Sequence, residues 1–173
     1  MTLEPISFDE ALGLVVNLEG RYANDPSDPG GETKWGIARK RHPEISEADW
    51  AKFSPGDARN LYKTSYFDAH RCGEMPRGWG LAIFDGEVVQ GEVIKLAQAA
   101  IGAVPDGQVG PQTLVRFQLA THEDFCLFMA LRGVKYTHSP LFPRDGKGWL
   151  KRLFLISAFA LESPHDGPTS AGA

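Results

Sequence analysis

The sequence of 173 residues contains only two cysteines, five histidines and no surplus of basic charge. Cys72 and Cys126 fit neither a disulfide framework nor a metal-ligand spacing, so we expect two free thiols from a reducing compartment. The histidines are scattered, without a pair at helical or hairpin spacing, which argues against a zinc enzyme. A formal net charge of −4 argues against a general nucleic-acid binder, whose surface would be basic. We therefore expect no metal, no cofactor and no nucleic-acid partner.

Long apolar segments are also missing from the chain. No stretch approaches the ~20 apolar residues needed to span a bilayer, and residues 1–5 lack the charged start and apolar run of a signal peptide. These absences predict a protein that is made and folded in the cytoplasm, and that another agent must release if it acts outside the cell. Because no helix pattern offers a long exposed apolar stripe, we also expect a monomer without stable membrane insertion.

The sequence does contain a succession of helix signals. Ser7 and Glu10 form a capping box, apolar residues follow at helical spacing, and Gly20 ends this first helix. Residues 23–31 are so rich in turn formers that neither helix nor strand can continue through them. Residues 33–38 are the one plausible β segment, part of a small hairpin. Further helices are predicted from Ser46, from Ser54 with Pro55 through Tyr62 and Tyr66, over 80–90, over 92–101, from Pro111, from Thr121, and from Trp149 after turn residues at 140–148.

Glu19 is the residue whose position points most directly to chemistry. It lies three and four residues beyond Val16 and Val15, so it extends the apolar face of the first helix. Loss of solvation on that face and the negative end of the helix dipole both raise the pKa of a carboxyl group. A carboxyl group that stays protonated near neutral pH can act as a general acid. The alternative is a buried structural ion pair with Arg21 or Arg132.

A specific combination of residues begins at Glu19, with fixed offsets: Glu19-Gly20-Arg21-Tyr22, Asn24-Asp25-Pro26, Asp28-Pro29-Gly30-Gly31 and Thr33-Lys34-Trp35-Gly36-Ile37. This combination resembles the signature of the glycoside hydrolase family 108 muramidases, which are endolysins and secretion-associated cell-wall hydrolases. It is similar, more broadly, to the phage-type lysozymes. The resemblance extends over roughly residues 8–160 and includes a C-terminal half, with the loop 106–111, that looks peptidoglycan-associated. It departs from the family at Val89-Gln90, where relatives often carry Asn beside a small residue.

The resemblance implies a mainly α, lysozyme-like α+β fold: a helical bundle with one small β-hairpin beside the catalytic helix. It implies a catalytic lobe at residues 1–91, a helical peptidoglycan-associated lobe at 92–162 packed on it, and a flexible tail at 163–173. The implied activity is that of an endolysin-type N-acetylmuramidase, which hydrolyses the β-1,4 bond between N-acetylmuramic acid and N-acetylglucosamine in bacterial peptidoglycan. Release would then depend on a holin or a secretion system, with action in the periplasm.

By the same resemblance, Glu19 protonates the glycosidic oxygen while Asp28 and Thr33 hold the attacking water. Asp28 follows Glu19 by nine residues, as in the acid pair of phage-type lysozymes, although the gap from Asp28 to Thr33 is one residue shorter here. Asp25 competes with Asp28 for this role, and either aspartate can instead be a turn residue. The distance between the two carboxyl groups, which distinguishes inverting from retaining enzymes, is not given by a sequence.

The substrate-binding candidates are Tyr22, Trp35, Tyr66 and Asp85. The aromatic residues among them can stack on sugar rings, and packing in the core is their alternative role. Two other functions stay open beside hydrolysis. A lytic transglycosylase would use the same Glu19 without water and leave an anhydro sugar. A non-catalytic cell-wall-binding protein would keep the cleft without the chemistry.

Overall fold

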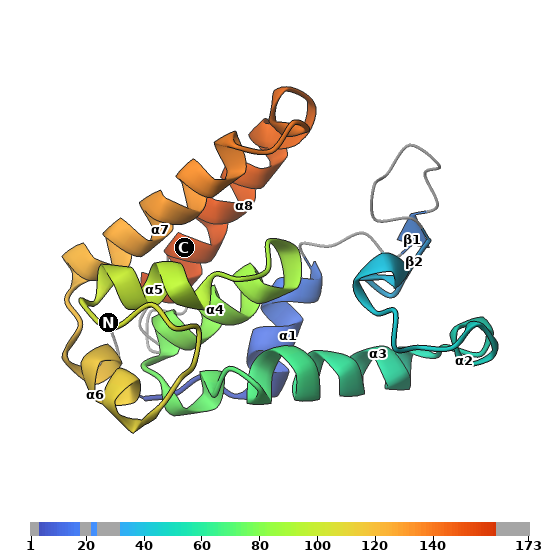
Figure 1. Ribbon diagram of the computed structural model, residues 1–173, viewed down its shortest axis with the longest axis horizontal. Coiled ribbons are helices and arrows are strands. Elements are labelled where there is room, and N and C mark those ends of the chain that lie inside the picture. The colour runs from blue at the N-terminus through green and yellow to red at the C-terminus, as the bar shows by residue number, and fades with distance from the viewer. Residues whose placement is uncertain (1–3, 18–21, 24–31, 162–173) are drawn as a thin grey trace, which may run out of the picture.

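The computed structural model describes residues 4–17, 22–23 and 32–161 of the chain. Figure 1 shows a mainly helical molecule with one small sheet, so the predicted fold class is confirmed. The helices and strands are, in chain order, α1 (Phe8–Asn17), β1 (Tyr22–Ala23), β2 (Thr33–Lys34), β3 (Ile37–Ala38), α2 (Glu47–Ala51), α3 (Pro55–Leu61), the π-helix Tyr62–Asp68, α4 (Arg77–Val89), α5 (Ile94–Ala100), α6 (Pro111–Leu119), α7 (His122–Thr137) and α8 (Phe142–Leu161), with short 3-10 turns at Arg39–Arg41 and Cys72–Glu74.

Helix α4 lies at the centre of the molecule and is buried along nearly its whole length. It contacts α8, α5, α1 and the π-helix, and Figure 1 shows α7 and α8 side by side as an antiparallel pair next to it. A helix surrounded on all sides must be apolar all round, and residues 81–84 of α4 are four apolar residues in succession, all fully buried. Near its start, the ring of Trp79 stacks on Phe128 with centroids 5.4 Å apart, which joins α4 to α7.

The helix starts that local sequence signals predict are present. In each case the N-cap hydroxyl accepts a hydrogen bond from the backbone N–H three residues later, which satisfies a donor that has no partner inside the helix. The pairs are Ser7 with Glu10, Ser46 with Asp49, Ser54 with Asp57, and Thr121 with Asp124. Pro55 and Pro111 occupy the first turns of α3 and α6, where a missing N–H costs nothing.

The predicted β segment forms a hairpin, β2 to β3, and a third short strand, β1, pairs with β2. The antiparallel register places Ala23 opposite Thr33. This pairing brings together the two described ends of the turn-rich segment 24–31. Only residues 18–21 separate the end of α1 from β1, so the sheet begins close to the first helix, as predicted.

Two regions differ from the sequence-based prediction. Helix α8 begins at Phe142, so it runs through the residues 140–148 that were expected to form a turn. Gly146 shows why glycine is tolerated inside this helix: a Cβ there would meet the Phe142 ring at 2.7 Å. The second difference is the π-helix, which follows α3 directly and carries both Tyr62 and Tyr66. Such widened turns occur frequently at functional sites.

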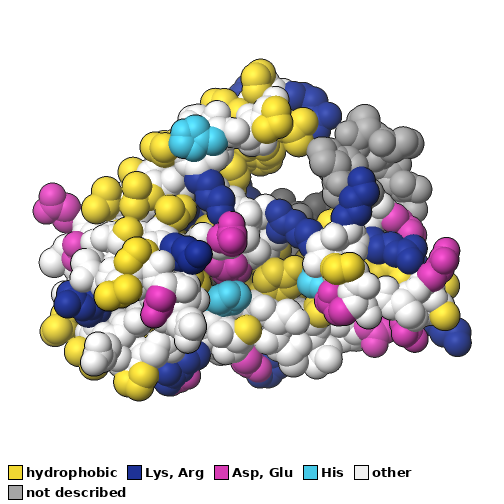
Figure 2. Space-filling model, viewed as in Figure 1, with side chains coloured by type: hydrophobic (Ala, Val, Ile, Leu, Met, Phe, Trp, Pro, Cys, Tyr) yellow, Lys and Arg dark blue, Asp and Glu magenta, His cyan; other side chains and the backbone are white. Residues whose placement is uncertain are grey.

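The outer faces of α7 and α8 expose apolar side chains at spacings of seven residues: Leu127 with Val134, and Phe154 with Leu161. Phe154 is 74% exposed, and Figure 2 shows hydrophobic side chains along the visible face of the α7 region. These exposed residues are pairs rather than a long apolar stripe, and the monomeric state stays a prediction. None of the described helices is both long and apolar enough to cross a membrane.

Gly80 and Gly13 form a matched pair for testing the packing of α4. A Cβ at Gly80 would lie 2.3 Å from the backbone oxygen of Cys72, whereas a Cβ at Gly13 in α1 would meet nothing within 4 Å. We expect Gly80→Ala to destabilise the protein by about 1–3 kcal/mol, because backbone must move. Gly13→Ala should stabilise it by roughly 0.5–1 kcal/mol through helix propensity. Urea unfolding of both variants tests this, and equal effects would refute the close approach.

Both cysteines are free thiols, as predicted, but they differ in environment. Cys72 is fully buried, and this burial raises the pKa of its thiol well above the ordinary value, whereas Cys126 is exposed on α7. Because the thiolate is the reactive form, we expect iodoacetamide to alkylate Cys126 in the native protein and Cys72 only after unfolding. Peptide mass spectrometry after a short reaction measures this, and equal labelling of the two would contradict the burial of Cys72.

Candidate active site

Helix α1 has one face in the core. Ala11 and Val15 on this face are fully buried, whereas Val16 is 37% exposed, so the buried side of the helix follows Val15 rather than Val16. Glu19 lies one helical turn beyond Val15 in sequence. Glu19 itself, with Asp25 and Asp28, lies outside the described residues, so the catalytic roles predicted for these three remain predictions.

Thr33 lies in β2, half-buried, and pairs with Ala23 on one side and Ala38 on the other. Hydrogen bonds from two side chains hold this strand and the residue before it to α2. The Trp50 indole N–H donates to Glu32 Oε2 at 2.8 Å, and the Lys34 ammonium donates to the Trp50 carbonyl at 2.6 Å. Trp50 is fully buried, so a core residue fixes the position of the strand that carries Thr33.

Trp35 forms the tip of the hairpin together with Gly36. Both residues have positive φ, 55° and 80°, which is the backbone of a type I′ turn. A bulky side chain in this left-handed region costs free energy, yet the Trp35 side chain is 44% exposed and so gains little from burial. The Tyr62 hydroxyl donates to the Trp35 carbonyl at 3.2 Å, which ties the strained tip to the π-helix. This arrangement presents an aromatic face to solvent beside Thr33. Tyr22 belongs to β1, on the other side of β2.

Tyr66 lies one turn beyond Tyr62, with the two ring centroids 6.1 Å apart. Its hydroxyl is 2.7 Å from Nε2 of His42, and Nδ1 of His42 is 2.8 Å from Glu44 Oε1. Burial raises the pKa of Tyr66, while hydrogen bonds from its own backbone N–H and from His42 lower the pKa of Glu44. The buried His42 was not a sequence-based candidate, because no helix or strand pattern includes it.

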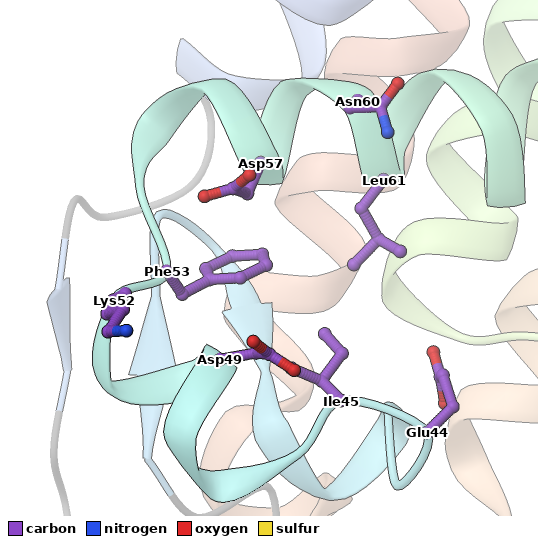
Figure 3. A pocket seen from close by; sticks show the side chains of 8 residues that line it. All are labelled: Glu44, Ile45, Asp49, Lys52, Phe53, Asp57, Asn60 and Leu61. Atoms are coloured by element: carbon purple, nitrogen blue, oxygen red, sulfur yellow. The ribbon is translucent and has the colours of Figure 1, made fainter.

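A pocket of about 450 Å³ opens between α2 and α3. Figure 3 shows the apolar side chains of Ile45, Phe53 and Leu61 around its middle, with carboxylates nearer its rim. Its lining residues are Glu44, Ile45, Asp49, Lys52, Phe53, Asp57, Asn60 and Leu61. The carboxylates of Asp49 and Asp57 each accept a hydrogen bond from the N-cap hydroxyl of their helix, so helix capping accounts for both.

Asp85 is placed differently from its predicted role as a sugar contact. Its side chain is fully buried in α4, with one oxygen accepting from Arg132 Nη2 and the other from Arg152 Nε, each at 2.7 Å. This placement leaves Asp85 no surface to offer a sugar, so a role in joining helices replaces the predicted substrate contact. Arg152 also donates to the Val15 carbonyl at 3.3 Å, which extends the connection to α1.

The loop 106–111 in the C-terminal half has a structural explanation. The buried Gln98 side chain donates to Asp106 Oδ1 at 2.7 Å and accepts from the Gly107 N–H at 2.8 Å. Hydrogen bonds from the Gln108 N–H and from Gln98 lower the pKa of Asp106. The turn is therefore fixed from inside the protein.

No group of three or more histidine, cysteine, aspartate or glutamate residues is arranged to hold a metal ion in the described part of the chain. Figure 2 shows that the visible face is hollowed between the tip of the α7–α8 pair and the side that carries the sheet, with lysine and arginine side chains along the border. The mainly helical fold with one small sheet is that of a lysozyme-like protein.

Comparisons with known proteins identify the class more closely. Residues 12–91 match the family model described as Glycosyl hydrolase 108. The structure is similar to one described as the structure of Brucella abortus SagA, with a TM-score of 0.80, 25% sequence identity, and coverage of 89% of this chain and 93% of that chain. No curated protein matches the sequence. Residues 12–91 are thus similar to the glycosyl hydrolase 108 family, as the resemblance implied, and the comparisons indicate a glycoside hydrolase.

The carboxylate of Asp85 can be compared with that of Asp145, which pairs with Arg144 on the surface. Removing one partner of a buried ion pair leaves an uncompensated charge and costs about 3–5 kcal/mol. We therefore expect Asp85→Ala to lower the free energy of unfolding by that amount. Asp145→Ala should change it by less than about 1 kcal/mol, as is usual for exposed pairs. Chemical denaturation monitored by tryptophan fluorescence measures both, and a small loss for Asp85→Ala would argue against its joining role.

Proposed function

We propose that this protein is an N-acetylmuramidase that hydrolyses the β-1,4 bond between N-acetylmuramic acid and N-acetylglucosamine of bacterial peptidoglycan, with Glu19 as the general acid. The observation that carries the proposal is the family match over residues 12–91, which contains the second part of α1, Glu19 and the whole sheet. A phage endolysin role, with release through a holin or a secretion system and action in the periplasm, is the biological setting that we infer from the family resemblance.

Chain connectivity supports the placement of Glu19 near the sheet. Three peptide units separate Glu19 from Tyr22, which limits the distance between their Cα atoms to about 11 Å. Glu19 also follows the buried face of α1 by one turn, close in sequence to the Val15 carbonyl that Arg152 binds. A carboxyl group between a buried helix face and a sheet edge loses solvation, which favours its protonated, acid-competent form.

Water activation by Asp28 and Thr33 is the feature that favours hydrolysis over transglycosylation. Thr33 is half-buried in β2 and lies opposite Ala23, so it adjoins the segment that contains both aspartates. We favour Asp28 over Asp25 as the second carboxylate on the spacing from Glu19. A separation of ~6.5–9.5 Å between the carboxyl groups of Glu19 and Asp28 would mean an inverting enzyme, and ~5–5.5 Å a retaining one.

Trp35, Tyr66 and Tyr22 are the residues that we propose to contact the glycan. Trp35 offers an exposed ring at a strained turn, and Tyr66 lies on the π-helix that supports this turn through Tyr62. We also propose that residues 1–91 form the catalytic lobe and residues 92–162 a peptidoglycan-associated lobe packed on it. Helix α4 belongs to the first lobe and contacts α5 and α8 of the second.

The substitution Glu19→Gln tests the central assignment. Because general acid catalysis contributes roughly 10²- to 10⁴-fold, we expect loss of lysis by that factor, with binding to purified cell walls retained. Glu47→Gln, at an exposed position in the first turn of α2, is the matched control and should leave lysis unchanged. Unaltered lysis by Glu19→Gln would refute Glu19 as the acid.

Mass spectrometry of the released fragments separates the candidate reactions. Reducing-end N-acetylmuramic acid is expected for a hydrolytic muramidase. An anhydro-muramic product would assign the enzyme to the lytic transglycosylases and leave Asp28 as a loop residue. Binding to cell walls without any cleavage would leave only the wall-binding function.

Trp35→Asn separates fold from function at the hairpin tip. Asn-Gly is the preferred pair for a type I′ turn, so the substitution should be neutral or stabilising, within about 1 kcal/mol, because it relieves the strain at Trp35. If Trp35 stacks on a sugar ring, the same substitution should raise the KM for soluble glycan fragments roughly 2- to 10-fold. Thermal unfolding and steady-state kinetics measure the two effects. An unchanged KM would remove Trp35 from the proposed glycan contacts.

A further inference from the structure

Three side chains form a continuous hydrogen-bonded series beside the hairpin. Glu44 Oε1 lies 2.8 Å from His42 Nδ1, and His42 Nε2 lies 2.7 Å from the Tyr66 hydroxyl. The His42 side chain is only 7% exposed, whereas that of Glu44 is 62% exposed. Figure 3 shows Glu44 at one end of the open pocket between α2 and α3. The series therefore runs from a solvated carboxylate, through a buried imidazole, to a half-buried phenol.

The chemistry of the three groups fixes the direction of these hydrogen bonds. Hydrogen bonds lower the pKa of Glu44, so its carboxylate is ionised and can only accept. Nδ1 of His42 must then carry the proton that is donated to Glu44. In the neutral imidazole Nε2 consequently has a lone pair and accepts the hydrogen of the Tyr66 hydroxyl. Burial raises the pKa of Tyr66, so this hydroxyl keeps its proton.

Tyr66 lies next to the residue that holds the hairpin tip, so the direction of its hydrogen bond affects the candidate site. Its ring adjoins that of Tyr62, whose hydroxyl holds the hairpin tip at the Trp35 carbonyl. His70 Nδ1 lies 2.8 Å from the Tyr66 backbone oxygen, which fixes the backbone of the π-helix at the same point. With its proton directed to His42, the Tyr66 oxygen has only lone pairs left, and it can only accept a further hydrogen bond.

We propose that His42, oriented by Glu44, is a positioning residue that sets the Tyr66 hydroxyl as a hydrogen-bond acceptor for an N–H or O–H group of the glycan strand. The proposal rests on the proposed function for the identity of the ligand. In this proposal Tyr66 selects a hydrogen-bond donor on the sugar. His42 and Glu44 do not touch the substrate, and they orient the Tyr66 hydroxyl.

The tautomer of His42 can be read without any activity measurement. Two-dimensional ¹H–¹⁵N spectra of the imidazole groups at pH 8 should show His42 with the proton on Nδ1, which is the less common neutral form. The spectrum of His42→Gln assigns the signal. A proton on Nε2 would overturn the proposal, because Nε2–H would donate to the Tyr66 oxygen and turn the phenol hydrogen away from His42.

Coupling between His42 and Tyr66 is tested by glycan binding in the Glu19→Gln background, where bound fragments are not cleaved. Calorimetry with a soluble oligomer of alternating N-acetylglucosamine and N-acetylmuramic acid gives the Kd. We expect His42→Ala and Tyr66→Phe each to weaken binding about 5- to 10-fold, as for one lost hydrogen bond. The double variant should be no weaker than either single variant. His42→Gln should restore much of the affinity, since its amide oxygen can accept the Tyr66 hydrogen.

His138→Ala, at an exposed position after α7, is the matched control and should bind as the parent does. Additive losses in the double variant would overturn the proposal, because His42 would then act independently of the Tyr66 hydroxyl. If His42→Ala lowers the unfolding temperature, His42→Gln and Tyr66→Phe still test the proposal. His42→Gln should then bind the glycan oligomer more tightly than Tyr66→Phe, and equal Kd values would contradict the proposal. Failure of Glu19 as the general acid has a different signature, since Glu19→Gln would then keep its lytic activity while the His42 tautomer remains as expected.

Discussion

The carboxylate of Asp85, buried between Arg132 and Arg152, is the interaction on which the arrangement of the helices depends. An unpaired charge in the interior would cost several kcal/mol, so α4 can be enclosed only where α7 and α8 each supply a guanidinium. Arg132 further donates to the Gln90 side chain and to the Ala82 carbonyl, which satisfies the donors of a fully buried cation. Through the Val15 carbonyl, Arg152 fixes the end of α1 to the same point. One charge cluster therefore connects α1, α4, α7 and α8.

Helix α4 also positions the opposite side of the candidate site. The Arg41 guanidinium donates to the carbonyls of Val88 and Val89 at 2.6 and 2.9 Å, two acceptors that a helix end leaves without partners. Arg41 immediately precedes His42, so this capping contact holds the segment from which His42 and Glu44 reach Tyr66. The glycan contacts that we propose thus lie between two connections to one buried helix. A rigid support of this kind is what a site needs if it must orient single hydrogen bonds.

The parts of the structure that a sequence predicts are those set by local chemistry. Ser46, Ser54 and Thr121 begin helices because a hydroxyl satisfies a nearby backbone N–H, whatever the rest of the chain does. The burial of Asp85 could not be predicted from local sequence, because its partners Arg132 and Arg152 lie 47 and 67 residues further along the chain. The start of α8 was missed because Gly146 signals a turn locally, and only the Phe142 ring folded over it explains a helix. His42 has no periodic pattern around it, so its role becomes visible only through its contacts.

The candidate site lies where local preferences are overridden. Trp35 occupies a left-handed turn that favours asparagine or glycine. The π-helix widens a regular α-helix after Leu61. His42 is a polar side chain in a buried position. Each feature costs free energy by itself and persists only because surrounding contacts over-determine it. The hydroxyl of Tyr62 connects two of them, since it lies on the π-helix and binds the carbonyl of Trp35. Sequences conflict with their own fold mainly where function requires it, and this cluster of conflicts lies at the hairpin and the π-helix that we propose to contact the glycan.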